Sequence, residues 1–464
     1  MTRRELMQVF GMMAVARNLR GVTADLKLRV LGRTGKRVVP FALGGQASLQ
    51  WTNPGIDPAG IIVRAVELGV NYLDSANAYG PSQVNYGEAF RRLHLVPGTS
   101  RYNAALREKL FVASKTGRRY AIDRTQPTAR TAVEELKRSL TQMFGDGQGF
   151  IPEGAYLDSI QMHNLTSLQQ VDQLYENFDR RDDRSVDRLG ALAAMLDFRD
   201  GTNVTGLNPE KRRWIRHIGI TGHQSSPVLM NALQRDKGNI LDTLLVAMNA
   251  NDRRYLCHQN NVLPLAAAKG MGVIAMKVFA DGVFYGKEPR FSRAPVDVCL
   301  TVGKDGAVAS ADLMRYPLAQ TGVSCAIVGI GWINPDNPGD DQIVSNLAAS
   351  QMDAASAREL ARIEDDVACR HGVETNYFQE RARGIVQPSS VTTILDGERV
   401  TVRWNGALAG PEPLHSYRVY AGDRLVAAIP YRPQTSPAPL AYTVAAKEVG
   451  SAPVRVVASE QPSL

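Results

Sequence analysis

The sequence has few of the residues that build metal ribbons, disulfide scaffolds or membrane spans. Its 464 residues include only four cysteines, none in a CxxC pair: Cys257, Cys299, Cys325 and Cys369. This excludes a zinc ribbon, a cysteine-ligated iron–sulfur cluster and a disulfide-stapled fold. There is no run of 18 uncharged apolar residues, so no transmembrane helix is expected. HExxH, GxSxG and Walker lysine motifs are also missing, and the histidines lack metal-ligand spacing, so we expect no metal site.

The positive charge of the chain is concentrated at its amino terminus. The formal net charge is +8, but residues 1–37 alone carry +7 and residues 385–464 carry +1. Residues 38–384 are therefore electroneutral. A nucleic-acid-binding groove needs a basic surface, so we expect no nucleic-acid partner for the large middle of the chain.

The basic amino terminus has two interpretations. Arg3-Arg4 followed by the apolar residues 9–16 resembles a twin-arginine export signal, with residues 22–24 as a small-residue cleavage site. Arg17 and Arg20, however, interrupt the end of the apolar stretch, which favours an amphipathic leader helix that stays attached. We therefore treat residues 1–26 as a leader and expect a cytoplasmic protein, with twin-arginine export as the alternative.

From about residue 27 the sequence alternates short apolar runs with helical periods. The runs are mostly apolar on both faces, as strands buried between a barrel interior and a helix layer must be. They cover residues 38–45, 72–77, 110–115, 157–164, 215–222, 243–249, 273–279 and 325–331. Helical periodicity occurs between them, including residues 129–143, 256–270, 309–321 and 341–370. Eight such units predict a (β/α)₈ barrel over residues 27–384, although a doubly wound sheet would alternate in a similar way.

A short hairpin is predicted before the first barrel strand. Residues 26–30 and 36–39 flank the turn Arg33-Thr34-Gly35, in which the glycine supplies a positive φ. Such a hairpin would cap the bottom of the barrel.

After residue 387 the composition and the period change. Residues 388–464 contain nine prolines and a single lysine, and apolar residues alternate with a period of two at Val400, Val402 and Trp404, at Tyr417, Val419 and Ala421, and at Tyr442 and Val444. This pattern predicts a small β-sandwich domain, whose Trp404 and Tyr417 strands resemble a fibronectin type III module. The domain carries no cluster of ionisable residues, so we expect a packing module or a docking module for a protein partner.

Four polar side chains are predicted to meet at the mouth of the barrel. Asp74 lies at the end of the second strand with Tyr79 in the loop beyond it, Lys115 ends the third strand and His163 lies at the end of the fourth. The carboxyl ends of the strands form the active site of such barrels. A lysine ammonium favours the phenolate, so Lys115 is expected to lower the pKa of Tyr79, while Asp74 holds the ammonium.

The chemistry of this set is proton transfer. His163 would orient a carbonyl oxygen at the Tyr79 hydroxyl, which would protonate a developing alkoxide or, in reverse, take a proton from an alcohol. The set contains neither a nucleophile nor a metal ligand cluster. A hydride must come from elsewhere, and nicotinamide is its usual source.

The motifs around these residues resemble the aldo-keto reductase family. They are Leu31-Gly32-Arg33-Thr34-Gly35, Tyr72-Leu73-Asp74-Ser75-Ala76 with Tyr79-Gly80, Ala113-Ser114-Lys115, Gln161-Met162-His163 and Ile218-Gly219-Ile220-Thr221. The resemblance extends over about residues 27–370. It implies a (β/α)₈ barrel that binds NADP(H) without a Rossmann domain, with Tyr79 as general acid/base, Lys115 and Asp74 tuning it and His163 orienting the substrate.

The resemblance also implies a set of cofactor contacts, at some of which this chain departs from the family. Thr221 and Gly222 stand where the family has Ser-Asn, and Asn249 precedes an alanine where the family has a glutamine. Lys277 is expected near a phosphate, and His223 near the nicotinamide pocket. The full set is Thr221, Gly222, Asn249, Met276, Lys277, Gly329, Gln342 and Asn346, of which the last three resemble the segment that holds the adenosine 2′-phosphate.

These observations favour an NADPH-dependent oxidoreductase that reduces an aldehyde or ketone, or oxidises the corresponding alcohol. The alternative is a nicotinamide-binding redox sensor or scaffold with little turnover. A third hypothesis is a barrel hydrolase or isomerase that acts on sugars. It is disfavoured because no paired carboxylates occur at the strand ends.

Overall fold

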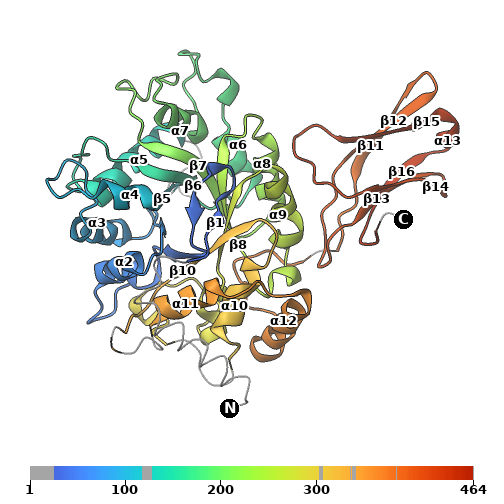
Figure 1. Cartoon of the computed structure of the whole chain (residues 1–464). Coiled ribbons are helices and arrows are strands. Elements are labelled where there is room, and N and C mark those ends of the chain that lie inside the picture. The colour runs from blue at the N-terminus through green and yellow to red at the C-terminus, as the bar shows by residue number, and fades with distance from the viewer. Residues whose placement is uncertain are drawn as a thin grey trace.

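Two bodies of different architecture make up the structure, which is a computed structural model (Figure 1). It describes residues 26–117, 128–301, 307–334, 336, 341–382 and 384–462. The leader predicted over residues 1–26 therefore lies outside the described residues, except for its last residue. So does most of the 118–128 loop.

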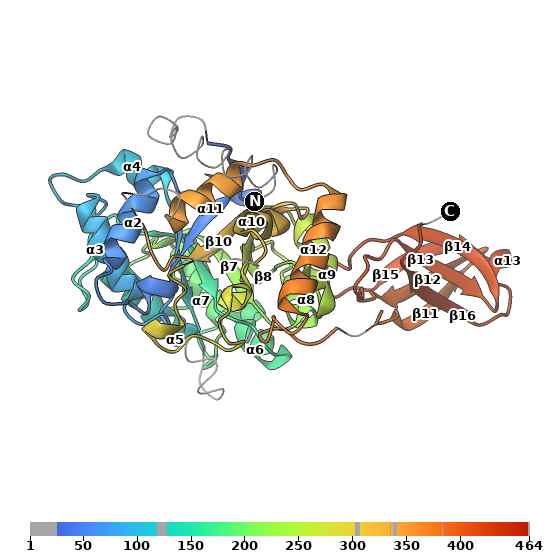
Figure 2. The ribbon, with the colours of Figure 1, turned by 90° about the horizontal axis from the view of Figure 1, so that it is seen from below.

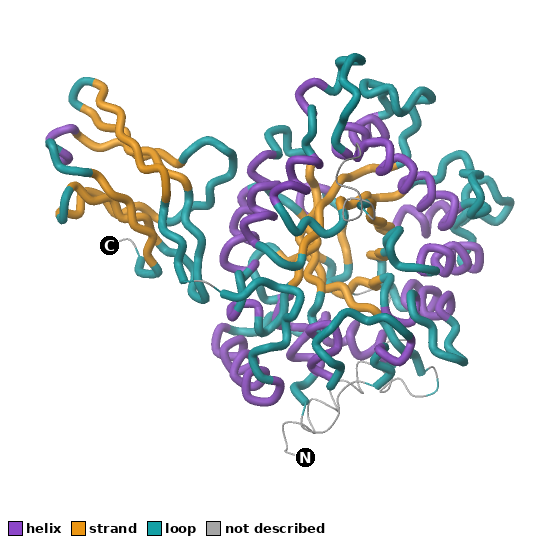
Figure 3. Tube along the Cα trace, turned by 180° about the vertical axis from the view of Figure 1, so that it is seen from behind, coloured by secondary structure: helices purple, strands orange, loops and turns teal. Residues whose placement is uncertain are grey.

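Eight parallel strands close into a barrel in the order β10-β3-β4-β5-β6-β7-β8-β9. They are β3 (Phe41–Gly44), β4 (Tyr72–Asp74), β5 (Phe111–Thr116), β6 (Leu157–Met162), β7 (Ile215–Gly222), β8 (Leu241–Ala247), β9 (Gly272–Met276) and β10 (Val323–Gly329). All eight fall on predicted runs, and β5, β6 and β8 are buried along their whole length, as their apolar faces require. Figure 3 shows the strands as a central ring with helices outside it. The predicted (β/α)₈ barrel is confirmed.

The outer layer consists of amphipathic helices. Those described are α2 (Pro58–Glu67), α3 (Ser82–Arg92), α4 (Ala104–Lys109), α5 (Thr128–Phe144), α6 (Leu168–Leu174), α7 (Ala191–Asp200), α8 (Ser226–Arg235), α9 (His258–Ala268), α10 (Ser310–Leu318), α11 (Gln342–Gln351) and α12 (Ala357–His371). The single helix predicted over 341–370 is wrong. It is interrupted because the Ser356 hydroxyl accepts from the Glu359 amide while the Glu359 carboxylate accepts from the Ser356 amide, a capping box that starts α12.

The predicted hairpin closes the amino-terminal end of the barrel. It consists of β1 (Arg29–Val30) and β2 (Arg37–Val38), which pair antiparallel around a turn that ends in Gly35 with φ of 69°. Leu31 is fully buried and packs in the same apolar cluster as the barrel interior. The Arg33 amide donates to the Gly270 carbonyl at 2.8 Å, just before β9. The hairpin therefore plugs the bottom and leaves the opposite end for the site.

The C-terminal body is an all-β domain of two three-stranded sheets. One contains β11 (Ser389–Asp396), β12 (Arg399–Asn405) and β15 (Leu440–Ala445), and the other β14 (Arg424–Pro430), β13 (Ser416–Ala421) and β16 (Val454–Ser459); a short helix, α13 (Ala446–Val449), follows β15. The rings of Trp404 and Tyr417 meet in its core with centroids 5.4 Å apart. The predicted alternation holds for β12 and β13, but Tyr442 remains 39% exposed.

The sandwich projects from the side of the barrel that carries α8, α9 and α12 (Figure 2). Asn261 on α9 donates to the Ala409 carbonyl at 3.1 Å and accepts from the Ala409 amide at 2.8 Å. Arg253 pairs with Glu412. These contacts join the sandwich to Arg253 and to the first turn of α9. Across the described residues, no helix combines the length and the apolarity needed to cross a bilayer.

Candidate active site

A buried ion pair joins two neighbouring strands at the mouth of the barrel. Lys115 on β5 donates to the Asp74 carboxylate at the end of β4 and to the Ser75 carbonyl at 2.9 Å. The two charged side chains are only 1% and 3% exposed. Burial alone would lower the pKa of Lys115, but Asp74 and Tyr79 outweigh it, so the pKa of Lys115 lies above its usual value and the ammonium stays charged.

Tyr79 lies directly over this lysine. Its ring follows β4 in the turn predicted from the sequence, and the Lys115 ammonium is 4.6 Å from the ring centroid. The Tyr79 amide donates to the Ala76 carbonyl at 3.1 Å, which fixes the turn. The structure thus brings together Asp74, Lys115 and Tyr79, three of the four residues predicted to meet.

We expected Lys115 to bring the pKa of Tyr79 below its ordinary value, and this prediction is wrong. Burial raises the pKa of Tyr79, Lys115 opposes this, and the outcome is a pKa above the ordinary value. A lysine at the ring therefore limits the effect of burial without reversing it. Tyr79 is protonated at neutral pH, the form that a proton donor needs.

His163 completes the group from the next strand. It follows β6, and its ring stands edge-on to Tyr79, with centroids 5.6 Å apart and an interplanar angle of 85°. Burial first, then Lys115 and Lys277, lower the pKa of His163 to about 3. The imidazole is therefore neutral at physiological pH and offers one donor and one acceptor.

A cavity of about 160 Å³ extends from Tyr79 toward the strands β9 and β10. Five of the eight residues predicted to contact a cofactor line it, together with Asp74 and Tyr79: Met276, Lys277, Gly329, Gln342 and Asn346. Its wall also includes Gly45, where a Cβ would come within 2.7 Å of the Asp74 carbonyl oxygen. This glycine allows the wall to approach the buried acid so closely.

The other three predicted cofactor residues do not line this cavity. Thr221 is fully buried, and its hydroxyl accepts from the Asn164 amide at 2.7 Å. Gly222 lies against Leu229. Asn249 is also fully buried, and both of its amide atoms are used, in a reciprocal pair with Asn376 at 2.9 and 3.1 Å. The sequence could not show this pair because Asn376 comes from the segment after the last helix.

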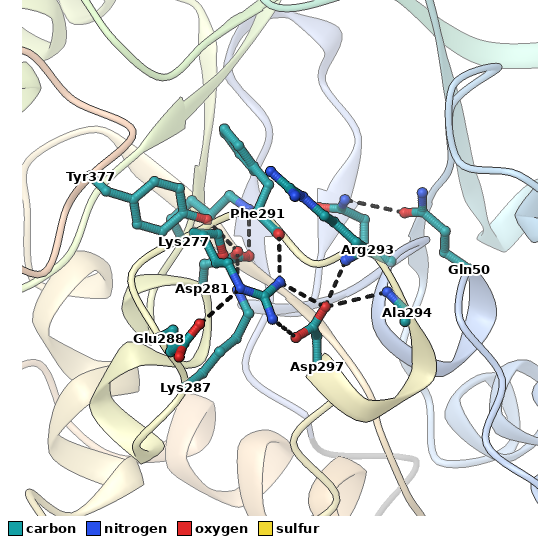
Figure 4. A network of polar contacts seen from close by, with 12 residues as sticks. Gln50, Lys277, Asp281, Lys287, Glu288, Phe291, Arg293, Ala294, Asp297 and Tyr377 are labelled. Atoms are coloured by element: carbon teal, nitrogen blue, oxygen red, sulfur yellow. Dashed lines mark hydrogen bonds and ion pairs between the residues drawn. The ribbon is translucent and has the colours of Figure 1, made fainter.

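Lys277 lies at the predicted place, but it already has an anionic partner. Its ammonium pairs with Asp281 Oδ1 at 2.5 Å, and Asp281 Oδ2 accepts from Lys287 at 2.8 Å and from the Tyr377 hydroxyl at 2.6 Å (Figure 4). Burial would raise the pKa of Asp281, but the two lysines lower it to about 2. Two lysines thus share one carboxylate, and the cluster carries a net positive charge.

The backbone of this cluster is strained. Lys277 has φ of 58°, and Ala280 and Asp281 have φ of 49° and 59°. A non-glycine residue in this region costs of the order of 1–3 kcal/mol, and such strain concentrates at functional sites. The chain that follows β9 is therefore held over the cavity at a cost in stability.

Aromatic residues that sequence reasoning missed surround Lys277. Its ammonium lies 5.4 Å from the Phe291 ring centroid and 5.9 Å from that of Phe378. Phe291 also contacts Tyr377 edge-on at 5.1 Å. Phe291 lies in a long loop, and the pair Tyr377-Phe378 follows α12. The sequence offered one signal for these contacts, the two adjacent aromatic residues after α12, and they belong to no periodic pattern.

Among the described residues, no group of three or more His, Cys, Asp or Glu side chains is placed to hold a metal ion. Eight parallel strands form a (β/α)₈ barrel, and a tyrosine over a buried lysine–aspartate pair forms a candidate proton-transfer site at its carboxyl end.

Comparisons with known proteins find similarity to one family. Residues 43–179 match the model of the Aldo/keto reductase family, and this segment contains all four residues of the candidate site. The chain is 23% identical over 373 residues to L-glyceraldehyde 3-phosphate reductase of Escherichia coli K12, over 74% of this chain and 93% of that protein. The first part of the barrel is therefore similar to the aldo/keto reductase family.

Solved structures of similar proteins include an aldo/keto reductase from Klebsiella pneumoniae in complex with NADP and acetate. It is 17% identical, with a TM-score of 0.45, covering 73% of this chain and 95% of that one. A Klebsiella pneumoniae aldo-keto reductase in complex with NADPH is 16% identical, with the same TM-score and the same coverages.

Proposed function

We propose that this protein is an NADP(H)-dependent oxidoreductase that reduces an aldehyde or ketone, or oxidises the corresponding alcohol. The observation that carries the proposal is the Lys115 ammonium held between Asp74 and the ring of Tyr79. The family match supports it, as does a relative that is a reductase of an aldehyde, L-glyceraldehyde 3-phosphate.

The residues of this chain handle the proton. A protonated Tyr79 donates to the carbonyl oxygen as negative charge develops there, and Lys115 beneath the ring stabilises the phenolate that remains. A neutral His163 donates to the same oxygen and fixes its position. The nicotinamide cofactor would supply the hydride.

The lining of the cavity suits a cofactor that carries phosphates. The cavity is lined by glycines, by Met276 and Lys277 after β9, and by Gln342 and Asn346 at the start of α11. Lys277 and Lys287 supply positive charge for phosphates. We therefore propose that Met276, Lys277, Gly329, Gln342 and Asn346 hold the cofactor.

The test is Tyr79→Phe with NADPH and a panel of aldehydes. We expect turnover to fall by about 100-fold or more, the effect of losing a general acid, while the NADPH Kd stays unchanged. Equal turnover by the variant would remove Tyr79 from its role. Tight NADPH binding without turnover of any panel member by the wild type would support the sensor or scaffold, and absence of binding would support a barrel with other chemistry.

A further inference from the structure

A glutamine lies inside the barrel, in an interior that such folds usually fill with apolar side chains. Gln161 is on β6 and is fully buried. Its Nε2 donates to the Tyr72 hydroxyl at 3.1 Å and to Asp74 Oδ2 at 3.3 Å, and both of these residues are on β4. Because β5 lies between β4 and β6, the Gln161 side chain crosses the barrel interior to reach them.

The two carboxylate oxygens of Asp74 have different donors. Oδ1 accepts from the Lys115 ammonium and Oδ2 accepts from Gln161. An ionised carboxylate only accepts, so Gln161 must present its amide nitrogen, and its two N–H groups serve Asp74 and Tyr72. The amide therefore fixes the rotation of the carboxylate that aims Oδ1 at the ammonium beneath Tyr79.

This orientation of the amide has a cost in stability. Among the described residues, Gln161 Oε1 has no protein hydrogen-bond partner, although it is buried. An unpaired buried polar atom destabilises the fold, and an apolar side chain of the same shape would avoid that loss. Departures of this kind from the rules of a stable core are expected at functional sites.

We propose that Gln161 is a positioning residue for proton transfer, whose amide holds the Asp74 carboxylate so that Lys115 stays under the ring of Tyr79. This inference rests on the proposed function, because it assumes that Tyr79 transfers the proton. Gln161 is not among the residues that line the cavity, so it acts through Asp74 and Lys115. Tyr72 supports the amide from the other side, and its ring is stacked on Phe111 with centroids 5.0 Å apart.

The first test is Gln161→Met, which keeps the length of the side chain and removes both N–H groups. The measurement is the single-turnover rate of NADPH oxidation by an aldehyde, which separates the chemical step from product release. We expect this rate to fall by about tenfold or more, the effect of losing one hydrogen bond to a charged group. The NADPH Kd should stay unchanged, because Gln161 lies outside the cavity.

The second test is Gln161→Glu, which keeps the shape of the side chain and makes it titratable. While the new carboxyl is protonated, its O–H can donate to Asp74 Oδ2 as the amide does. Once it is ionised, two carboxylates face each other beside one ammonium, and both burial and the like charge raise the pKa of such a group. The single-turnover rate should therefore fall as the pH rises between about pH 5 and 9, a range in which the wild type shows no step.

The ionisable groups around this network come from several elements. Those that act on Asp74 or Tyr72 are on β5, in the loop after β4, on α3, on β6 and on β10: Lys115, Tyr79, Tyr86, Asp158 and Cys325. Burial raises the pKa values of the tyrosines and the thiol, which stay neutral in this range. Asp158 is paired with Arg107 at 2.8 Å. A step in the rate of the variant therefore reports the introduced carboxyl.

Gln83 on α3 provides matched controls. It is 1% exposed, accepts from the Ser114 hydroxyl at 2.9 Å and donates to Gln142 on α5 at 3.0 Å. Its amide thus lies in the helix layer and does not contact Asp74. Gln83→Met and Gln83→Glu should lower the melting temperature but leave the single-turnover rate and its pH profile as in the wild type.

The outcomes separate the two proposals. An unchanged rate in folded Gln161→Met, or a rate step in Gln83→Glu equal to that in Gln161→Glu, would overturn the positioning role and leave the proposed function standing. Thermal unfolding shows which variants are folded at each pH, and Gln161→Met alone decides if Gln161→Glu unfolds. A wild type that binds NADPH but reduces no member of the aldehyde panel would overturn the proposed function, and this inference with it.

Discussion

The two sides of the barrel mouth bury lysines in different ways. Lys115 and Asp74 come from adjacent strands, so the register of β4 and β5 sets their positions, and the pair has few other partners. Lys277 and Asp281 come from one loop, four residues apart. Asp281 is shared with Lys287 and Tyr377, so the loss of one partner leaves the carboxylate with two others.

A buried charge can therefore be compensated by one precisely placed partner or by several partners around the same group. A strand pair gives a fixed geometry, which proton transfer needs. A shared carboxylate in a loop tolerates rearrangement, which suits a segment that must admit a ligand. The net positive charge of the loop cluster is consistent with phosphate binding there, whereas Asp74 and Lys115 balance each other.

The largest expected effect separates the two lysines directly. Lys115→Met leaves Asp74 buried with only Gln161, at 3.3 Å, as a polar side-chain partner among the described residues. Such an uncompensated charge costs about 3–5 kcal/mol of unfolding free energy. Lys277→Met leaves Asp281 with two partners and should cost only about 1–3 kcal/mol, the range for one charged hydrogen bond.

Urea unfolding at pH 7 measures both losses on the same scale. Lys277→Met is the matched control, because both substitutions replace a buried lysine with an apolar side chain of similar length. Equal losses in the two variants would contradict the distinction between a dedicated and a shared carboxylate.

A smaller effect is expected in the pH dependence. Because the pKa of Tyr79 lies above its ordinary value and that of His163 is about 3, both groups keep one protonation state between about pH 5 and 9. Carbonyl reduction should therefore show no step near pH 6.5 from the histidine. Alcohol oxidation needs the phenolate and should rise with pH throughout this range, as steady-state rates at saturating substrate would show.

The same histidine links stability to pH. An unfolded histidine takes up its proton near pH 6.5, whereas folded His163 does so near 3. Its contribution to stability is therefore complete above pH 6.5 and declines as the pH falls toward 3. In His163→Asn this part of the decline between pH 7 and 4.5 should disappear, and an identical decline in the variant would refute the shift.

The sequence alone was sufficient to predict which side chains lie at the strand ends of the mouth. Runs that are apolar on both faces predict buried strands, and strand ends bring Asp74, Lys115 and His163 together whatever the loops do. The net pKa of Tyr79 was predicted wrongly because the sequence supplies its charged neighbour but not its burial. That balance depends on how closely the mouth is packed.

The contacts made by the loop residues of the mouth could not be predicted in the same way. Asp281 meets Tyr377 across 96 positions, and Asn249 meets Asn376 across 127. Both partners come from the stretch between α12 and the sandwich, where no periodicity marks a face. These side chains become neighbours only because the stretch after α12 folds back over the mouth of the barrel.

The smallest effect is expected from removing the sandwich. A chain ending at residue 384 keeps Asn376 and Tyr377 over the mouth and loses the Asn261 contacts to Ala409 and the Arg253 pair with Glu412. The apolar cluster of the sandwich is separate from those of the barrel except that Leu408 packs against the barrel cluster, so the barrel should stay folded with an unchanged NADPH Kd. Its melting temperature should fall by only a few degrees.

A second truncation shows whether the connecting stretch belongs to the barrel. A chain ending at residue 371 also loses Asn376 and Tyr377, so the buried Asn249 side chain keeps only the Lys277 carbonyl and the Asn251 amide as partners, and Asp281 loses Tyr377. Each lost hydrogen bond costs about 0.5–1.5 kcal/mol, and more where a charged group takes part, so this chain should melt below the one ending at 384 and bind NADPH more weakly. Equal melting temperatures for the two chains would mean that residues 372–384 do not stabilise the mouth.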